Sequence, residues 1–298
     1  MKVLVTGSSG HLGEALMRTL AAAGHEPLGI DILAAPFTAC VGSIVDRGFV
    51  RRCLTGVDAV LHTATLHKPH VATHRAQDFI DVNVTGTLNL LEESVTAGVS
   101  TFVFTSTTSA FGRSLVPPPG APAAWITEQV TPQPKNIYGV TKLAAENLCE
   151  LAQRDTGLPC LILRTSRFFP EDDDDPAARR QFPGMNLKVN EFLYRRVEIE
   201  DVVSAHLLAL KEAPRVGFGR YIISATTPFE PGDLAELRRD APAVLRRREL
   251  GWRPAHDFDA VLGRLEAGGE AFSPLARLIG SKGYHAQPRA ILLSVGIE

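Results

Sequence analysis

An α/β fold built on a doubly wound parallel sheet is predicted by three features of this sequence. Apolar, strand-like segments alternate with amphipathic helical ones from the start, which is the order of βαβ units in a parallel sheet. A glycine-rich turn, Gly7–Gly13, joins the first strand to the first helix. The alternation stops after Arg164, so a small C-terminal subdomain is expected. The predicted division assigns residues 1–165 plus 197–224 to the sheet domain and 166–196 plus 225–298 to the subdomain.

Seven strands are expected, because each segment is short, apolar and bounded by turn residues. In chain order they are Lys2–Thr6, His25–Asp31, Cys40–Val41, Asp58–His62, Thr101–Ser106, Pro159–Arg164 and Arg220–Ser224. The run Ala59-Val-Leu61 contains no polar residue, which is typical of a strand covered on both faces.

The helices between these strands are expected to end where glycine interrupts an amphipathic pattern, as Gly24 and Gly98 do. Their predicted ranges are 11–23, 46–54, 78–97, 138–155 and 197–210. A turn and another helix are expected within 249–268, and the tail from Ser281 shows no clear pattern.

Composition and charge are those of an ordinary globular protein. The chain has 298 residues, with 31 basic and 33 acidic side chains, so no nucleic-acid partner is expected. It has no apolar run of membrane-spanning length and no secretory leader pattern, which predicts a cytoplasmic protein without membrane association. The four cysteines lack C-x-x-C spacing, so we expect reduced thiols and neither disulfides nor a zinc site.

The glycine-rich turn has the right neighbours for binding a dinucleotide. Glycines between a strand and a helix allow the backbone to approach a pyrophosphate, and the helix N-terminus adds N–H groups and a positive dipole end. Asp31 ends the second strand, where a carboxylate binds ribose hydroxyls and repels a 2′-phosphate. The sequence therefore predicts a Rossmann-type site for NAD. Ala64, beyond the fourth strand, is expected to form a close wall of this site, with His62 structural.

A second pattern, Tyr138-Gly-Val-Thr-Lys142, places a phenol and an ammonium group one helical turn apart. Tyrosine is a poor base at neutral pH, because its pKa is about 10, and a nearby positive charge favours the phenolate. The cluster Thr105-Ser-Thr-Thr-Ser109 follows the fifth strand at the same edge of the sheet. A hydroxyl there can hold a substrate oxygen while Tyr138 moves the proton; a polar turn is the alternative interpretation.

Two clusters of potential metal ligands in the sequence do not indicate a metal site. His67, His70 and His74 are interrupted by Pro69 and have no interleaved carboxylate, so their loop is expected to border the substrate site. The acidic run 171–175 lacks the alternating ligand spacing of a calcium loop, so we expect a solvated loop.

The chain resembles the extended short-chain dehydrogenases/reductases of the NAD-dependent epimerase/dehydratase family. The matching stretches are Thr6–Gly13, Asp58–Ala64, Asp81–Leu91, Phe102–Thr107, Tyr138–Lys142 and Leu250–Pro254. The resemblance implies that Tyr138 is the catalytic acid/base, that Lys142 is its partner, and that Thr107 supplies the catalytic hydroxyl. It also implies a substrate-binding role for the subdomain. The cofactor site that it implies consists of Gly7, Gly10, His11, Leu12, Gly13, Asp31, Ser43, Ile44, Ala64, Asn83 and Lys142.

Departures from the family's pattern bear on the reaction and the substrate. Ser43 stands where the family commonly has an aspartate that contacts the adenine, and its hydroxyl can still form a hydrogen bond there. Thr108 and Ser109 replace the acidic pair that follows the threonine in dehydratases, which argues against a dehydratase. The segment 170–196 is short for a lobe that grips a diphosphate, which favours a smaller substrate.

Thr108, Arg167 and Arg195 are the candidate substrate contacts. A guanidinium group binds a carboxylate or phosphate through two parallel hydrogen bonds, so the arginines, with Arg196, are suited to an anionic group. Ion pairing with the acidic run is an equally good explanation for them.

The expected function is that of an NAD-dependent oxidoreductase that transfers hydride at a secondary alcohol or ketone of a sugar-like or other small hydroxylated substrate. An NAD-retaining 4-epimerase of a sugar or nucleotide sugar is the alternative, because it uses the same half-reaction twice. A regulator that senses NAD is the non-enzymatic alternative. The resemblance also implies a homodimer formed by helices 78–97 and 138–155, the second of which carries extra apolar residues such as Val140 and Leu151.

Overall fold

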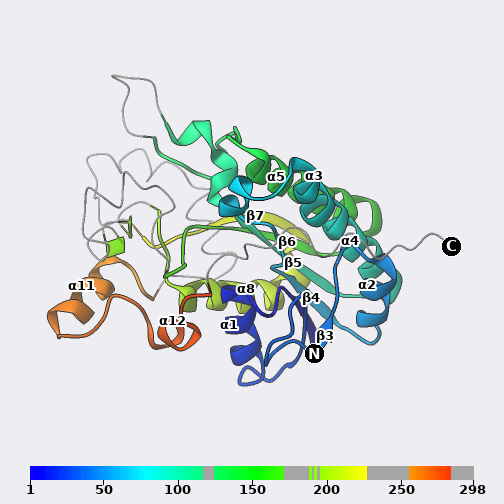
Figure 1. Cartoon of the computed structure of the whole chain (residues 1–298), viewed down its shortest axis with the longest axis horizontal. Coiled ribbons are helices and arrows are strands. Elements are labelled where there is room, and N and C mark those ends of the chain that lie inside the picture. Colours follow the sequence, from blue (N-terminus) through cyan, green and yellow to red (C-terminus); the bar gives the residue numbers. More distant parts are fainter. Residues whose placement is uncertain (117–123, 171–187, 190, 193–194, 227–254, 283–298) are drawn as a thin grey trace.

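The computed structural model describes residues 1–116, 124–170, 188–189, 191–192, 195–226 and 255–282. Within these ranges, seven parallel strands form one sheet in the order β3-β2-β1-β4-β5-β6-β7 (Figure 1). The strands are β1 (Lys2–Thr6), β2 (Glu26–Asp31), β3 (Cys40–Val41), β4 (Ala59–His62), β5 (Thr101–Thr107), β6 (Cys160–Thr165) and β7 (Phe218–Ile223). The predicted fold class is confirmed, and the strand ends differ from the predicted ones by two residues at most.

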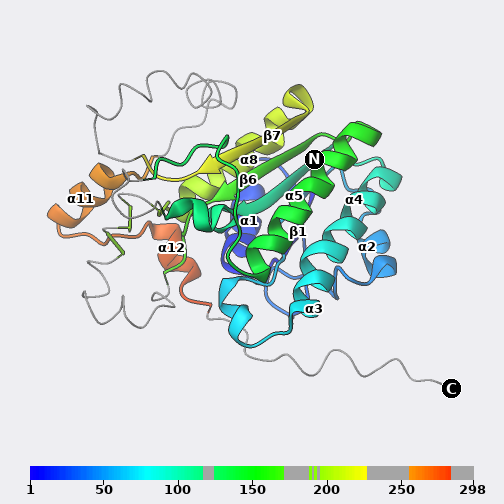
Figure 2. The same cartoon turned by 90° about the horizontal axis from the view of Figure 1, so that it is seen from above.

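Helices cover both faces of the sheet, as the two perpendicular views show (Figures 1 and 2). One layer contains α1 (His11–Leu20), α8 (Ile199–Val216) and α12 (Pro274–Ile279). The other contains α2 (Arg47–Cys53), α3 (Ala76–Phe79), α4 (Gly86–Ala97) and α5 (Ile137–Thr156), while α11 (Phe258–Glu266) lies apart from both layers.

The strands β1, β4, β5, β6 and β7 each contribute to two hydrophobic clusters, because successive side chains point to opposite faces. In β1, Val3 and Val5 pack with the α1 and α8 layer, whereas Leu4 packs with the layer of α2, α4 and α5. All three side chains are fully buried. Burial on both faces explains the uninterrupted apolar sequences of the central strands.

The strand order reverses between β1 and β4. β1 pairs with β2 on one side and with β4 on the other, with Thr6 opposite Ile30 and His62. The connections therefore leave the carboxyl ends of β1 and β4 in opposite directions and open a crevice there. Ligands of doubly wound sheets bind at this switch point, which is where the glycine-rich turn lies.

The helix predicted for 78–97 is interrupted in the structure. A π-helical segment, Ile80–Thr85, separates α3 from α4. A π-helical turn contains an extra residue and often occurs at functional sites. Here it carries Asn83, whose side chain is buried. Amphipathic spacing alone does not reveal such an insertion.

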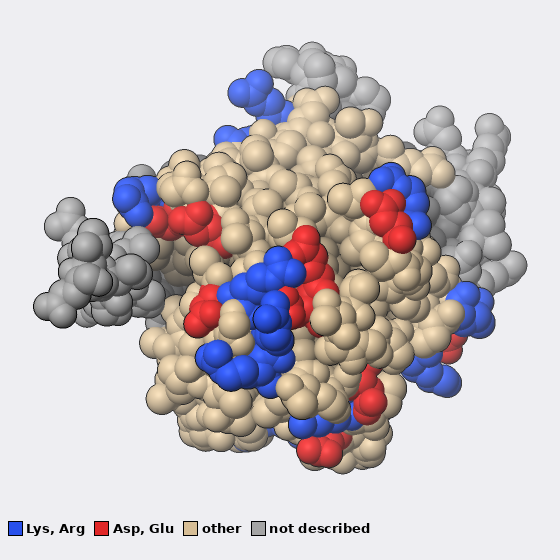
Figure 3. Space-filling model, turned by 90° about the vertical axis from the view of Figure 1, so that its right-hand side faces the viewer, with Lys and Arg blue, Asp and Glu red and all other residues tan. Residues whose placement is uncertain are grey.

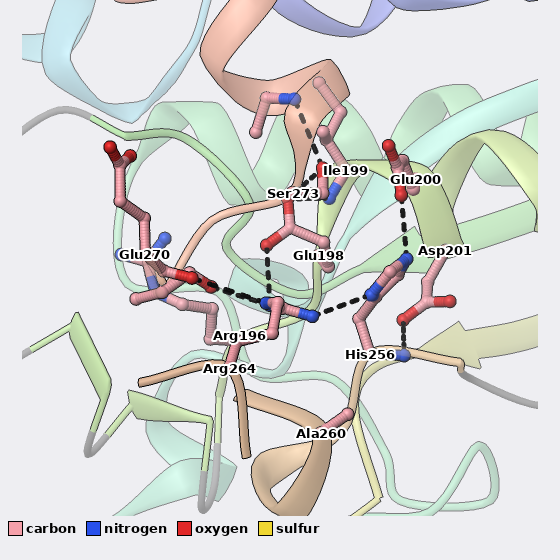
Figure 4. Close-up of polar contacts among 12 residues, drawn as sticks. Arg196, Glu198, Ile199, Glu200, Asp201, His256, Ala260, Arg264, Glu270 and Ser273 are labelled. Carbon is pink, nitrogen blue, oxygen red and sulfur yellow. Dashed lines mark hydrogen bonds and ion pairs between the residues drawn. The ribbon is translucent and has the colours of Figure 1, made fainter. Parts of the chain in front are cut away.

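The described C-terminal residues dock onto the N-terminal part of α8 (Figure 4). The Asp201 carboxylate accepts hydrogen bonds from the backbone N–H groups of Ala255 and His256, at 2.7 and 2.9 Å. The buried Glu198 carboxylate accepts one from the Ser273 hydroxyl at 3.0 Å. Burial raises the pKa of both carboxyl groups. Most of the predicted subdomain lies outside the described residues, so that division stays a prediction.

Basic and acidic side chains are interspersed on the side of the molecule formed by α2 and α4 (Figure 3). Arg47 of α2 pairs with Glu92 and Glu93 of α4 at 2.5 and 2.6 Å, and Arg51 pairs with Glu93 at 2.8 Å. In the part of the chain that the structure describes, no helix combines the length and the apolar character needed to cross a bilayer.

Candidate functional site

The glycine-rich turn is packed too tightly for side chains at two of its three glycines. Gly7 has a φ of +72°, which favours glycine, and a Cβ there would lie 2.9 Å from the backbone nitrogen of Ala64. A Cβ on Gly13 would lie 1.9 Å from the carbonyl oxygen of Gly7. At Gly10 the nearest atom to a Cβ would be 3.3 Å away. The first and third glycines therefore let α1 pack against the turn, and at the second a Cβ would also make a tight contact, with the Gly7 carbonyl.

The N-terminus of α1 is suited to an anion. Its N-cap residue is Gly10, so no side chain caps the first N–H groups of the helix. The side chain of Leu12 is buried in the core beneath the turn. The His11 ring accepts a hydrogen bond from the backbone N–H of Lys282 at 3.1 Å. The helix end thus offers backbone N–H groups and its dipole, which fit the pyrophosphate of a dinucleotide.

Asp31 lies beside the same turn, at the end of β2. One of its carboxylate oxygens accepts a hydrogen bond from the N–H of Ser9, and the other accepts one from the N–H of Leu33, both at 3.0 Å. These bonds fix the carboxylate next to the glycine-rich turn. Because a carboxylate has about four acceptor positions, Asp31 can also accept hydrogen bonds from ribose hydroxyls.

A series of hydrogen bonds through His62 fixes the backbone of Thr63 and Ala64, which lies against the glycine-rich turn. The Thr6 hydroxyl oxygen accepts from the N–H groups of Thr63 and Ala64, so its proton is donated to Nδ1 of His62 at 2.8 Å. The Thr87 hydroxyl donates to the carbonyl of Asn83, so it accepts from Nε2 of His62 at 2.9 Å. His62 is therefore a neutral, structural histidine, and burial lowers its pKa well below the usual value.

Ser43 and Ile44 form the loop that follows β3. The Ser43 hydroxyl accepts a hydrogen bond from the N–H of Val45 at 3.2 Å. The carbonyl of Ile44 accepts one from Asn89 of α4 at 3.1 Å, and a Cβ on Gly86 would lie 2.6 Å from the Ile44 side chain. The loop is thus fixed against the start of α4.

Asn83 connects two parts of the site through its side-chain amide. Its oxygen accepts from the Thr65 hydroxyl and the N–H of Leu66, at 2.9 and 2.8 Å. Its nitrogen donates to the carbonyl of Leu66 and to the Thr141 hydroxyl, both at 3.1 Å. Asn83 therefore holds the loop after β4 against α5, at the residue before Lys142.

Tyr138 and Lys142 lie on the buried face of α5, and both are almost fully inaccessible to solvent. Nζ of Lys142 donates a hydrogen bond to the carbonyl oxygen of Thr105 at 2.6 Å and lies 4.0 Å from the centre of the Phe104 ring. The Asn136 side chain caps α5 by accepting from the N–H of Gly139 at 3.0 Å. The cap and the contact with β5 fix the first two turns of α5 against the carboxyl half of that strand.

Burial dominates the electrostatics of Lys142. It lowers the lysine pKa from 10.5 to about 7, although the carboxylate of Glu146 acts in the opposite direction. The ammonium form is therefore only partly populated at neutral pH. Any anion that forms nearby, such as a phenolate, would raise the lysine pKa again by charge attraction.

Thr107 and Thr108 follow one another at the end of β5, but their hydroxyl groups have different partners. The Thr107 oxygen accepts a hydrogen bond from the N–H of Ser109 at 3.1 Å, which leaves its proton to be donated. The Thr108 hydroxyl is directed at the carbonyl of Thr165 on β6, at 3.5 Å.

Aromatic rings extend from Tyr138 toward the glycine-rich turn. The ring centres of Tyr138 and His67 are 6.1 Å apart, those of His67 and Phe169 are 5.8 Å apart, and those of Phe169 and His11 are 5.6 Å apart. These contacts place His67 of the histidine loop next to Tyr138, and the loop's role at the substrate site stays a prediction. The described residues contain no group of His, Cys, Asp or Glu arranged to hold a metal ion.

Three arginines surround one buried carboxylate, that of Glu191: Arg167 lies just beyond β6, and Arg195 and Arg196 lie shortly before α8. Arg195 and Arg196 each pair with it at 2.5 Å, and Nε of Arg167 lies 3.9 Å from it. The acidic run proposed as their alternative partner lies outside the described residues. The structure therefore brings Arg167 and Arg195 together.

Glu146 is a residue of this region that the sequence analysis did not identify. It lies one turn beyond Lys142 on the same face of α5 and is completely buried. The spacing Tyr138, Lys142, Glu146 was the available signal, because residues four apart share a helix face.

Comparisons with known proteins agree with this geometry. Residues 3–223 match the family described as the NAD dependent epimerase/dehydratase family. A UDP-glucose 4-epimerase of Streptomyces lividans is 27% identical over 312 residues, which cover 85% of this chain and 92% of that protein. The uncharacterized protein y4nG of Sinorhizobium fredii is 35% identical over 167 residues, 54% of this chain and 39% of its own length.

The fold also matches solved structures. A short-chain dehydrogenase/reductase superfamily protein from Agrobacterium tumefaciens, crystallised with bound NAD, superimposes with a TM-score of 0.64 at 24% identity. The alignment covers 88% of this chain and 95% of that one. With the family match spanning most of its length, this chain belongs to the NAD-dependent epimerase/dehydratase family and is an NAD-dependent enzyme.

Proposed function

We propose that this enzyme oxidises or reduces a secondary alcohol or ketone of a small, sugar-like substrate, with Tyr138 as acid/base. The observation that carries this proposal is the burial of Tyr138 and Lys142 together on α5, beside the carboxyl half of β5. The glycine-rich turn occupies the same edge of the sheet, at the end of β1. Hydride transfer and proton transfer need such a shared edge, because both must act on the same carbon–oxygen group.

The cofactor would be held by the parts of the site described above. Gly7, Gly10 and Gly13, with the first N–H groups of α1 at His11 and Leu12, fit its pyrophosphate. Asp31 fits the adenosine ribose, and Ser43 and Ile44 fit the adenine side. Ala64 forms the opposite wall, Asn83 supports it, and Lys142 reaches toward the nicotinamide ribose. When bound, the cofactor would supply the hydride acceptor for oxidation and, in its reduced form, the hydride donor for reduction.

The protein's own groups would move the proton. Tyr138 accepts the proton of the substrate hydroxyl during oxidation and returns it during reduction. The Thr107 hydroxyl, whose proton is free to be donated, holds the substrate oxygen. Lys142 in its ammonium form stabilises the phenolate of Tyr138 by charge attraction.

An NAD-retaining 4-epimerase is the second candidate, supported by the relative from Streptomyces lividans that matches over most of both chains. Arg167 and Arg195 would bind an anionic part of either substrate, because guanidinium groups form paired hydrogen bonds with a carboxylate or phosphate and the two side chains lie together around Glu191. Thr108 remains a weaker candidate for contacting substrate. A cytoplasmic location stays a prediction.

A homodimer through α4 and α5 is part of the proposal. Both helices expose large apolar side chains although each already packs on the sheet: Leu88, Val95, Val140 and Leu151 are 36–49% exposed. Exposed apolar side chains on two neighbouring helices suit a second copy of the same surface, because most soluble oligomers are symmetric dimers.

Replacing Gly13 by alanine tests the cofactor site. The added methyl would collide with the Gly7 carbonyl, so we expect NAD affinity to fall at least about tenfold and the free energy of unfolding to fall by about 1–3 kcal/mol. Gly263→Ala is the matched control, because nothing lies within 4 Å of a Cβ there. Calorimetric NAD titration and thermal unfolding are the measurements, and unchanged NAD affinity in Gly13→Ala would contradict the assigned site.

Tyr138→Phe tests the acid/base assignment. Loss of the phenol should reduce kcat by about 10²–10⁴-fold, while the NAD dissociation constant stays within about threefold because the ring is kept. Tyr221→Phe, a change on β7, should retain normal turnover. Steady-state rates across a panel of sugars and sugar acids provide the test, and a near-normal rate for Tyr138→Phe would exclude the proposed chemistry.

The amount of NAD that remains with the purified protein separates the two candidate reactions. We expect little, because a dehydrogenase exchanges its cofactor in every turnover. The protein is denatured and the released nucleotide is quantified by chromatography and mass spectrometry. One NAD per chain would instead favour the epimerase, which regenerates its cofactor within the cycle.

Static light scattering at micromolar concentration tests the dimer. We expect twice the chain mass for the wild type and a shift toward the monomer for Leu151→Glu, because a charge would be buried in the interface. Leu278→Glu changes an equally large apolar residue that is 63% exposed on α12 and should leave the mass unchanged. A wild-type monomer would disprove the proposed interface.

A further inference from the structure

The carboxylate of Glu146 joins three elements of the sheet domain in a fully buried position. It accepts a hydrogen bond from the Ser106 hydroxyl of β5 at 2.5 Å. It also accepts two or more from the Arg164 guanidinium of β6, the shortest at 2.6 Å. Nε of Arg220 on β7 lies 3.5 Å from it. Glu146 and Arg164 are 0% and 3% exposed at their side chains, so this ion pair is shielded from water.

These contacts place α5 against the strand that carries Thr107. Lys142 bonds to Thr105, and Glu146, one turn further along, bonds to Ser106. Two neighbouring residues of β5 are thus tied to two successive turns of α5. The next residue of β5 is Thr107, so the distance between its hydroxyl and the phenol on α5 depends on these two bonds.

Glu146 also contributes to the charge around Lys142. Among the described residues, the groups that act on the ammonium or are acted on by it include Glu146 and Cys149 from α5 and His62 from β4; the Phe104 ring and the Thr105 carbonyl also contact it, and the Tyr138 phenol lies one turn earlier on α5. His62 is held neutral by its hydrogen bonds, and burial raises the pKa of the Cys149 thiol well above its usual value. Glu146, which is ion-paired with Arg164, is therefore the carboxylate among these groups.

A gain in folding stability does not by itself explain the buried ion pair between Glu146 and Arg164. Removing two charges from water costs several kcal/mol, and apolar replacements of buried ion pairs are often neutral or stabilising. The contacts of Glu146 instead converge on the two elements that carry the reacting groups.

We propose that Glu146 is a positioning residue for the Tyr138–Lys142 pair: its carboxylate fixes α5 to the end of β5 and supplies the negative charge that faces Lys142. This inference rests on the proposed function for its effect on turnover. Its effect on Lys142 can be measured without any substrate.

Glu146→Gln is the first test, because the amide keeps the shape of the side chain and removes its charge. Lysine labelled with 13C at Cε reports the titration of Lys142, identified by the signal missing from Lys142→Arg. Without the carboxylate the ammonium loses its attraction, so we expect the lysine pKa to fall by at least about half a unit. The pH at which activity declines should shift downward with it.

Turnover provides the second readout. In Glu146→Gln we expect kcat to fall at least about tenfold with KM changed less than about threefold, because misplaced groups weaken the transition state more than the bound substrate. Glu150→Gln is the matched control: Glu150 is one turn further along α5 and is half exposed, so both readouts should stay at their wild-type values. An unchanged Lys142 titration in Glu146→Gln, or equal effects in both variants, would overturn the proposal.

A second variant covers the case in which Glu146→Gln does not fold. Ser106→Ala removes the hydrogen bond to β5 and leaves both charges of the ion pair in place. We expect kcat to fall about three- to tenfold, with the Lys142 titration unchanged. A normal kcat in Ser106→Ala would show that the hydrogen bond between Ser106 and Glu146 does not position the Tyr138–Lys142 pair. If the wild type turned over no substrate at all, the proposed function would be wrong. The Lys142 titration in Glu146→Gln, shifted or unchanged, would still show whether Glu146 acts on Lys142.

Discussion

The docking of α5 against the carboxyl half of β5 is the constraint on which the rest of the site depends. A helix normally presents an apolar stripe to a sheet, but this one buries a phenol, an ammonium group and a carboxylate along the same face. Each charged group is compensated by a partner on a strand, Lys142 by the Thr105 carbonyl and Glu146 by Arg164. Because buried charges require such partners, the helix can take only one position along the strand.

The parallel topology brings the other half of the site to this position. All seven strands run in one direction, so the turn after β1 and the hydroxyl groups after β5 lie on one edge. The His62 chain and the Asn83 amide then connect the loop after β4 with α4 and α5. The half that binds a dinucleotide and the half that carries the phenol are thereby joined through the protein interior.

The sequence predicted the sheet, its seven strands and the two motifs, because apolar alternation and glycine spacing are local signals. It did not predict the π-helical segment around Asn83, whose extra residue is stabilised by contacts with residues 65, 66 and 141. It also missed Glu146, since the importance of that carboxylate comes from Arg164 and Ser106, which are distant in sequence. Partners on other elements cannot be recognised from spacing along one helix.

The hydrogen bonds through His62 all point the same way, from the amides of Thr63 and Ala64 through Thr6, His62 and Thr87 to the carbonyl of Asn83. Each group in the series is polarised by the one before it, which strengthens the whole chain. Because burial lowers the pKa of the His62 imidazole well below its usual value, we expect these bonds to keep their direction in mild acid. The wall at Ala64 therefore keeps its shape under conditions that would change the charge of an exposed histidine.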